Sequence, residues 1–174
     1  KKPIAVMSGR NAHTPAVFLG AVYAGCCYAP MDGTMPVHRL NSILNTLDTD
    51  LMIVQRAFYD KAKTLAFSGP ILIAEELLAG SEDAALLADC RARARELDPL
   101  YIIFTSGSTG TPQRVSKPVV SLDREARLLA AHFGERLAGC HVVASVVLHH
   151  LYGLTFRVVL PMALGLPLHA SLLN

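Results

Sequence analysis

A loop rich in hydroxyl groups and glycine offers the clearest chemistry in this sequence. Residues 105–111 contain five serines or threonines and two glycines, and they follow an apolar run, residues 100–104, that predicts a β-strand. Glycine lets the backbone turn its N–H groups towards an anion, and small hydroxyl side chains add donors without blocking close approach. The pattern predicts a phosphate-binding loop made of Thr105, Ser106, Gly107, Ser108, Thr109, Gly110 and Thr111.

Composition alone leaves a second interpretation of this loop open. Loops rich in serine and glycine are often simple turns. No Gly-Lys-Ser/Thr sequence closes residues 105–111, as it would in a P-loop NTPase, and the dinucleotide-binding fingerprint is absent as well. The residue types therefore point to an anion without identifying it.

Three segments resemble, in order and spacing, the sequence motifs of one enzyme superfamily. Tyr101-Ile-Ile-Phe-Thr-Ser-Gly-Ser-Thr-Gly-Thr-Pro112 resembles the phosphate-loop signature of the adenylate-forming enzymes, which include acyl-CoA synthetases, luciferases and peptide-synthetase adenylation domains. Gly25-Cys-Cys-Tyr-Ala-Pro-Met-Asp32 resembles an earlier stretch in which a helix ends at glycine and a strand follows. Val147-Leu-His-His-Leu-Tyr-Gly-Leu154 resembles the family's histidine-containing segment beside the acyl pocket. The resemblance spans nearly the whole chain and implies part of the large N-terminal domain of such an enzyme.

The resemblance also implies an activity. Residues 105–111 would hold the β- and γ-phosphates of ATP, with Mg²⁺, while a carboxylic acid substrate attacks the α-phosphorus; pyrophosphate leaves and an acyl-adenylate remains. The thiol of coenzyme A, or of phosphopantetheine on an acyl carrier protein, would then take the acyl group. His150 would be catalytic beside the substrate carboxylate, and His150, Tyr152 and Gly153 would line the substrate pocket. A non-catalytic nucleotide- or acyl-binding module that retains the fold is the alternative.

Several positions in these motifs have a second interpretation. A histidine after an apolar strand is often a hydrogen-bonded core residue, which is the alternative role for His150 and the one we assign to His149. Adjacent histidines lack a third ligand nearby in the sequence, so we expect no protein metal site. Family members usually have lysine after the loop's proline, whereas this chain has Gln113. We expect Lys117, or else Arg114, to supply positive charge near the phosphates.

Alternating apolar runs and helical patterns must position these motifs. They predict an α/β fold with a mostly parallel sheet flanked by helices. We expect strands at residues 4–7, 27–30, 51–54, 71–74, 100–104, 114–117 and 141–147. We expect helices that begin at Thr14, Pro36, Ser81 and Ser121 and again from Leu151. No repeat or Gly/Ser linker divides residues 1–174, so we expect a single domain.

Composition narrows the class of protein. A chain of 174 residues with 52% hydrophobic and 17% charged residues suits a buried α/β sheet, and a net charge of +2 without a basic stripe argues against a nucleic-acid surface. Four cysteines without CxxC spacing predict a reduced, cytoplasmic setting. Arg157 and Pro161 interrupt the most apolar stretch, which argues against a membrane span. The family's later motifs and its C-terminal lid domain do not occur in these residues, so we expect a fragment that is inactive alone.

Overall fold

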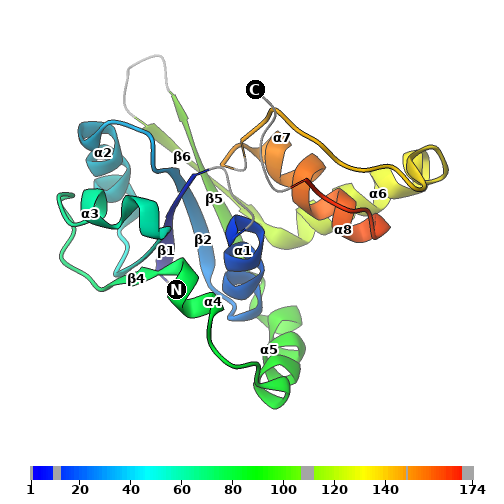
Figure 1. Cartoon of the computed structure of the whole chain (residues 1–174), viewed down its shortest axis with the longest axis horizontal. Helices are drawn as coiled ribbons and strands as arrows, with labels where there is room; N and C mark the ends of the chain where they lie inside the picture. Colours follow the sequence, from blue (N-terminus) through cyan, green and yellow to red (C-terminus); the bar gives the residue numbers. More distant parts are fainter. Residues whose placement is uncertain (1, 10–12, 107–111, 148, 170–174) are drawn as a thin grey trace.

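A six-stranded, mostly parallel sheet forms the centre of the fold (Figure 1). The computed structural model describes residues 2–9, 13–106, 112–147 and 149–169. The strands lie in the order β4-β3-β1-β2-β5-β6; β6 is antiparallel to β5, and the other neighbouring pairs are parallel. Their bounds are β1 Pro3–Ser8, β2 Cys27–Asp32, β3 Leu51–Val54, β4 Ile71–Ile73, β5 Leu100–Ser106 and β6 Pro112–Pro118. The predicted α/β class with a mostly parallel sheet is confirmed.

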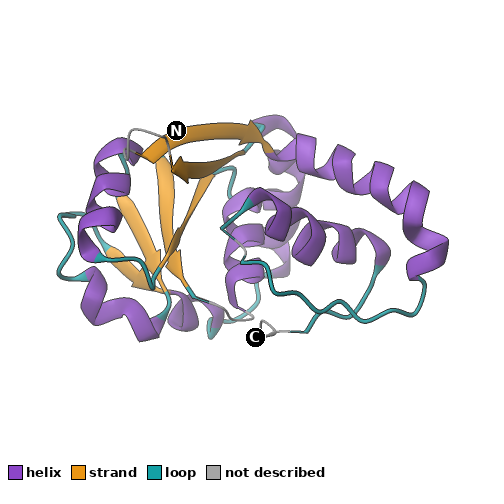
Figure 2. Cartoon of the chain, turned by 90° about the horizontal axis from the view of Figure 1, so that it is seen from above, coloured by secondary structure: helices purple, strands orange, loops and turns teal. Residues whose placement is uncertain are grey.

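Helices cover both faces of this sheet (Figure 2). Helices α2 and α3 pack on one face, and α1, α6 and α7 pack on the other. The helices are α1 His13–Tyr23, α2 Val37–Leu47, α3 Tyr59–Ala62, α4 Ala74–Leu78, α5 Ala84–Leu97, α6 Val119–Leu137, α7 Leu151–Leu154 and α8 Leu160–Leu164, with a 3₁₀ turn at Arg56–Phe58 and a π-helical segment at Thr155–Val159. Covering both faces buries the parallel strands, whose near-continuous apolar sequence requires it.

Alternation along the strands sends side chains into two separate cores. Met7 and Ile102 belong to the cluster under α2, whereas Val6 and Tyr101 belong to the cluster under α1 and α6. The α2 residues at the predicted helical spacing are all buried: Leu40, Ile43, Leu44 and Leu47. Strands β1, β2, β3 and β5 therefore each contribute side chains to both cores.

Helices α5 and α6 begin at residues other than the predicted ones. Asp83, and not Ser81, is the N-cap of α5, because its side chain accepts a hydrogen bond from the backbone N–H of Leu86 at 2.9 Å. Helix α6 begins before Ser121, whose hydroxyl donates to the carbonyl oxygen of Pro118 at 2.6 Å. A serine inside the first turn can bond backwards in this way, so a serine does not by itself mark the start of a helix.

Helix α1 likewise begins before its predicted cap. Thr14 lies within the helix and is buried, so it does not act as an exposed N-cap. The predicted stop at Gly25 is confirmed, since this residue adopts a φ of 65°. A Cβ there would overlap the side chain of Leu97. Glycine meets both requirements at the end of α1.

Residues 141–147 do not form the predicted strand. Among the described residues of this segment, the pairing found is a single bridge between Val142 and Leu168. Strand β6 already occupies the side of β5 that faces away from β2, so this segment has no free edge there. It leads instead into a helix that continues through α7, the π-helical segment and α8 and ends at Gly165, where φ is 64°.

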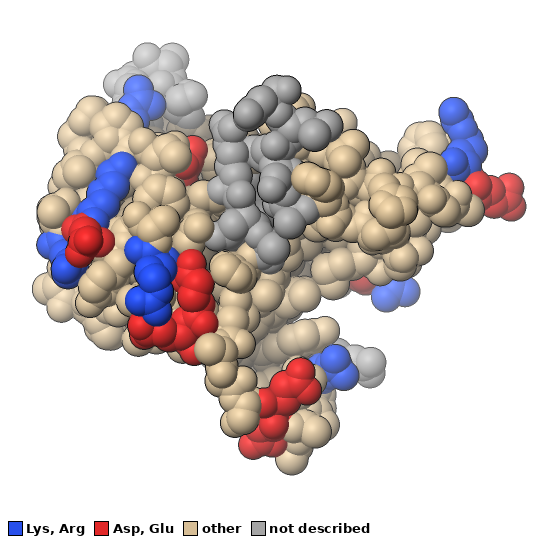
Figure 3. All heavy atoms as spheres, viewed as in Figure 1, with Lys and Arg blue, Asp and Glu red and all other residues tan. Residues whose placement is uncertain are grey.

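Charged side chains of both signs are scattered over the surface (Figure 3). Several form exposed ion pairs, such as Lys63 with Asp60 and Arg56 with Glu76. Pairs of this kind contribute little to stability because water screens them. Within the part of the chain that the structure describes, we find no helix with the length and apolar character needed to cross a membrane.

Candidate functional site

The hairpin of β5 and β6 carries the predicted phosphate loop at its tip. Ser106 pairs with Pro112 at the end of the ladder, so the loop joins the two strands at this point. Thr105 belongs to β5 and is exposed, and Ser106 is described only by its backbone. The other predicted loop residues lie outside the described residues: Gly107, Ser108, Thr109, Gly110 and Thr111. The flanking strands therefore locate the loop.

Three parallel strands end along the same edge of the sheet. Ser8 closes β1, Asp32 closes β2, and Thr105 lies one residue before the end of β5. Because these strands are parallel, their carboxyl ends lie side by side. Ligands of α/β proteins bind outside the carboxyl ends of the strands. The structure thus places the end of β5 beside two polar strand ends, at the edge where a ligand is expected.

The histidine segment reaches this edge through a contact between His149 and Asp32. Nε2 of His149 lies 3.7 Å from Oδ2 of Asp32, and the two side chains are 18% and 23% exposed. His150, the predicted catalytic residue, follows directly and is exposed. Its ring centroid lies 4.7 Å from that of His149. The residue to which we assigned a purely structural role is therefore the one that contacts the sheet edge.

Gly153 has a steric reason to be glycine. It is buried in α7, and a Cβ at this position would overlap the carbonyl oxygen of Val147 and lie 2.9 Å from its carbonyl carbon. This close approach seats the backbone before the two histidines directly against α7. Loop and helix therefore form one packed unit.

Tyr152 and Gly153 line a cavity of about 280 Å³ between α7 and residues 142–146. Tyr152 is 61% exposed, and its ring packs on that of Phe156 with centroids 4.4 Å apart. Valine side chains and Phe156 make much of the wall apolar. His150 is not among the residues that line this cavity. The structure thus joins two of the three predicted substrate-pocket residues in one cavity.

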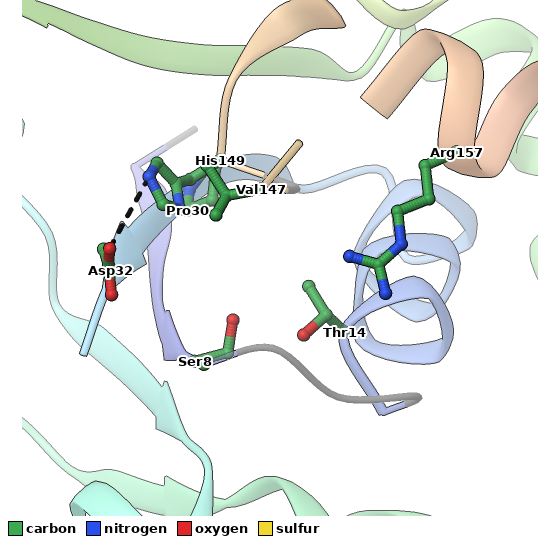
Figure 4. A pocket seen from close by; sticks show the side chains of 8 residues that line it. Ser8, Thr14, Pro30, Asp32, Val147, His149 and Arg157 are labelled. Carbon is green, nitrogen blue, oxygen red and sulfur yellow. Dashed lines mark ion pairs between the residues drawn. The ribbon is translucent and has the colours of Figure 1, made fainter. Parts of the chain in front are cut away.

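A second, much smaller cavity lies under the histidine segment (Figure 4). Its volume of about 10 Å³ leaves room for about one water molecule. Ser8, Thr14, Asp32, His149 and Arg157 contribute polar side chains to it. In Figure 4 the guanidinium of Arg157 points towards Thr14, and His149 points towards Asp32 on the opposite side.

Arg157 is an unusual residue for this position. Only 2% of it is exposed, and burial lowers the pKa of its guanidinium from the ordinary arginine value. The sequence did contain a signal, because a lone cation interrupts the apolar run of residues 151–164. That cation argued against a membrane span, and we did not assign it to a site. Asp32 likewise closed a quoted motif without being assigned a role.

Comparison with known proteins identifies the family. Residues 1–171 match the profile of the family described as AMP-binding enzyme. The chain belongs to this family. The resemblance to adenylate-forming enzymes drawn from the three motifs is thereby confirmed.

Relatives of the AMP-binding enzyme family share the sequence over about two thirds of the chain. One of the subunits of mycosubtilin synthase from Bacillus subtilis is 33% identical over 66% of the chain, which spans 4% of that protein. D-alanine--D-alanyl carrier protein ligase of Listeria monocytogenes serotype 4b (strain CLIP80459) is 33% identical over 66% of the chain, which spans 22% of that protein. The chain thus corresponds to a small part of each relative.

A solved member of the same superfamily has the same fold. The structure of holo-AB3403, a four-domain nonribosomal peptide synthetase bound to AMP and glycine, aligns with a TM-score of 0.72 at 23% identity. The alignment covers 98% of this chain and 12% of that chain. Together with the sheet order, this places the chain within the N-terminal domain architecture of adenylate-forming enzymes.

Gln113, where the resemblance led us to expect lysine, lies at the loop end of β6. It is exposed and pairs with Thr105. Lys117 lies opposite Tyr101, four residues further along β6, or about 14 Å away at 3.4 Å per residue. Arg114 is adjacent to Gln113 and is exposed, and its Nε donates to Oγ of Ser116 at 3.3 Å. Of the two cations considered, Arg114 is the nearer to the loop along the strand.

Proposed function

We propose that this chain forms the phosphate-binding part of an enzyme that activates a carboxylic acid with ATP. The observation that carries the proposal is the place where β5 ends, at the carboxyl edge of the parallel sheet, next to β2, whose last residue Asp32 contacts His149. On this proposal residues 1–174 act as a single domain, part of the N-terminal domain of the ligase. An anion-binding loop at that edge is suited to hold a nucleotide.

The proposed reaction displaces pyrophosphate from ATP. A carboxylate oxygen of the acid bonds to the α-phosphorus, the bond from that phosphorus to the bridging oxygen breaks, and pyrophosphate carries away its electron pair. The loop of residues 105–111 holds the β- and γ-phosphates in line through N–H and hydroxyl donors, so the leaving charge is stabilised without a protein nucleophile. Mg²⁺ bound with the nucleotide would supply further charge neutralisation.

The residues present fit a metal carried by the nucleotide rather than a protein cage. Among the described residues, no cluster of three or more His, Cys, Asp or Glu gathers to hold a metal ion. Magnesium in phosphoryl-transfer sites commonly takes its ligands from substrate phosphates, waters and one or two protein groups. The exposed hydroxyl of Thr105, at the base of the loop, is a donor and acceptor of suitable type.

The acid would approach from the side of the histidine segment. His150 is exposed next to the anchored His149, so its imidazole is available to the substrate carboxylate and to the incoming thiol. Tyr152 and Gly153 line a cavity of about 280 Å³ with both apolar and polar walls, which is suited to a small organic acid. We therefore assign His150 the catalytic role and Tyr152 and Gly153 the substrate contact.

The acyl-adenylate would pass its acyl group to a thiol. Coenzyme A and carrier-protein phosphopantetheine end in the same thiol. The similarity to a D-alanine--D-alanyl carrier protein ligase supports the carrier protein as partner. The thiol sulfur bonds to the acyl carbon, AMP leaves, and a thioester forms. A cytoplasmic location would supply ATP, Mg²⁺ and either acceptor.

A non-catalytic binding module is the second candidate, and Gln113 favours it. A neutral amide at the position of the usual lysine cannot neutralise pyrophosphate charge. In the catalytic proposal Arg114 or Lys117 replaces that charge, and the β6 register makes Arg114 the nearer group. The two candidates differ in whether pyrophosphate is released.

Exchange of labelled pyrophosphate into ATP tests the proposal. Because the chain spans 22% or less of the two relatives described, the assay uses a full-length protein that contains it. Aromatic, medium-chain and long-chain acids are compared, with the variants Arg114→Ala, Lys117→Ala and Gln113→Lys. Acid-dependent exchange supports the ligase, and the variant that loses it identifies the cation. Binding of Mg-ATP without exchange by any acid would favour the binding module.

A further inference from the structure

Asp32 is held in one orientation by its own turn. The backbone N–H and the hydroxyl of Thr34 both donate to Oδ1 of Asp32, at 2.9 and 2.7 Å. These two bonds fix the carboxylate plane. The other oxygen, Oδ2, is the atom that faces Nε2 of His149 at 3.7 Å (Figure 4). The carboxylate is therefore aimed at the imidazole before the histidine segment docks.

The environment strengthens this contact. The distance of 3.7 Å is too long for a direct hydrogen bond, but it is within the range of an ion pair once His149 is protonated. About four fifths of each side chain is shielded from water, so solvent screens the pair less than it screens a surface pair. Arg157, on the π-helical segment, lines the same small cavity on the side opposite His149 and Asp32 (Figure 4).

Movement of His149 must be transmitted to His150. The two residues are adjacent, their rings are in contact, and the backbone N–H of His150 donates to the carbonyl oxygen of Val147 at 3.4 Å. The carbonyl oxygen of His150 accepts from the N–H of Leu154 at 3.0 Å. Val147 in turn lies against Gly153, which ties this turn to α7. We therefore expect a shift of the His149 ring to displace His150 as well.

We propose that Asp32 and His149 are positioning residues that set the direction of the His150 imidazole. This inference rests on the proposed function, because it takes His150 to be the group that faces the substrate. Asp32 holds the first histidine against the end of β2, and the second histidine is consequently left exposed on the open side. The three residues Thr34, Asp32 and His149 form the Asp32 relay. The Asp32 relay thus connects the end of β2 to His150.

The test compares four forms of a full-length protein that contains this chain. These are the wild type, Asp32→Asn, His149→Gln and the double variant, assayed by pyrophosphate exchange. Asp32→Asn keeps an acceptor for Thr34 but removes the charge, so the turn survives. Asp50→Asn is the matched control, because it removes a carboxylate that pairs with Lys2 at the opposite end of the strands.

We expect each single variant to lower kcat about tenfold while the KM for ATP stays within about twofold, because misplacement of a reacting group affects the transition state more than binding. The double variant should have about the same kcat as the less active single variant, because both substitutions remove the same contact between Asp32 and His149. Thr34→Val should lower kcat in the same way and Thr34→Ser should restore it. A purely structural role would predict additive losses that track the melting temperature.

NMR spectra of protein with isotope-labelled histidine test the contact between Asp32 and His149 without an activity assay. Asp32→Asn should displace the ring signals of both His149 and His150, whereas Asp50→Asn should displace neither. Unmoved His150 signals, or wild-type kcat in both single variants, would overturn the inference. The variant His150→Ala separates the two proposals. If it exchanges pyrophosphate like the wild type, or if the wild type shows no exchange, the assigned role of His150 fails and the spectra alone decide whether the relay exists.

Discussion

Gly153 lies where α7 passes closest to the backbone of Val147, and replacement by alanine tests how tightly the histidine segment is seated. The added Cβ would lie 2.9 Å from the carbonyl carbon of Val147 and 3.2 Å from Cγ1 of Val146, with a still closer approach to the carbonyl oxygen. Carbon atoms in good contact are about 3.5–4.0 Å apart. The turn that carries the histidines, or α7 itself, must therefore move.

The magnitude follows from two opposing effects. Overpacking of this kind typically costs about 1–3 kcal/mol, whereas alanine in place of glycine in a helix gains up to about 1 kcal/mol. We expect a net loss of about 1–2 kcal/mol in the free energy of unfolding. For a chain of this length the melting temperature should fall by about 2–8 °C. Exchange activity should fall as well, since the shift reaches His150.

Gly20 provides the matched control for this prediction. It lies on an exposed position of α1, and a Cβ there would meet no atom within 4 Å. Gly20→Ala should therefore raise the stability by about 0.5–1 kcal/mol. The two variants, measured by thermal and urea denaturation, should move in opposite directions. A Gly153→Ala protein as stable as Gly20→Ala would refute the close packing of α7 against residues 146–147.

Three further predictions concern the core, a cap and alkaline pH. The hydroxyl of Tyr101 is buried and has no hydrogen-bond partner among the described residues, so Tyr101→Phe should leave thermal stability unchanged or raise it by about 1 kcal/mol; a loss above that size would reveal a partner. Asp83→Ala removes the hydrogen bond accepted from Leu86 and should lower the free energy of unfolding by about 1 kcal/mol. Amide exchange at the start of α5 should become faster, and an unchanged exchange rate would show that the cap is unimportant. Burial raises the pKa of Tyr28 and of Tyr101 above the ordinary tyrosine value. The folded state then resists ionisation, so stability is retained below about pH 10 and is lost as the pH rises further; Tyr101→Phe should reduce this loss in urea denaturation, and an equal loss in both proteins would contradict the assignment.

Most strands could be predicted because their cause is local. The apolar runs that became β1, β3 and β5, and the spacing of buried residues in α2, each follow from burial of one short segment. Residues 141–147 had an equally good strand pattern and did not form a strand. The pairing found for this segment is a bridge between Val142 and Leu168, outside the six-stranded sheet. Whether a segment reaches the sheet cannot be seen in the segment itself.

The sequence by itself indicated the family and predicted the strand that leads into residues 105–111, because the motif and this strand are contiguous in the chain. Only the tertiary structure decided which of two adjacent histidines faces the sheet. His149 meets Asp32 because parallel strands bring their carboxyl ends together whatever the distance along the chain. Only the tertiary structure, likewise, showed that β6 pairs antiparallel with β5, which sets Gln113 opposite Thr105 and Lys117 opposite Tyr101.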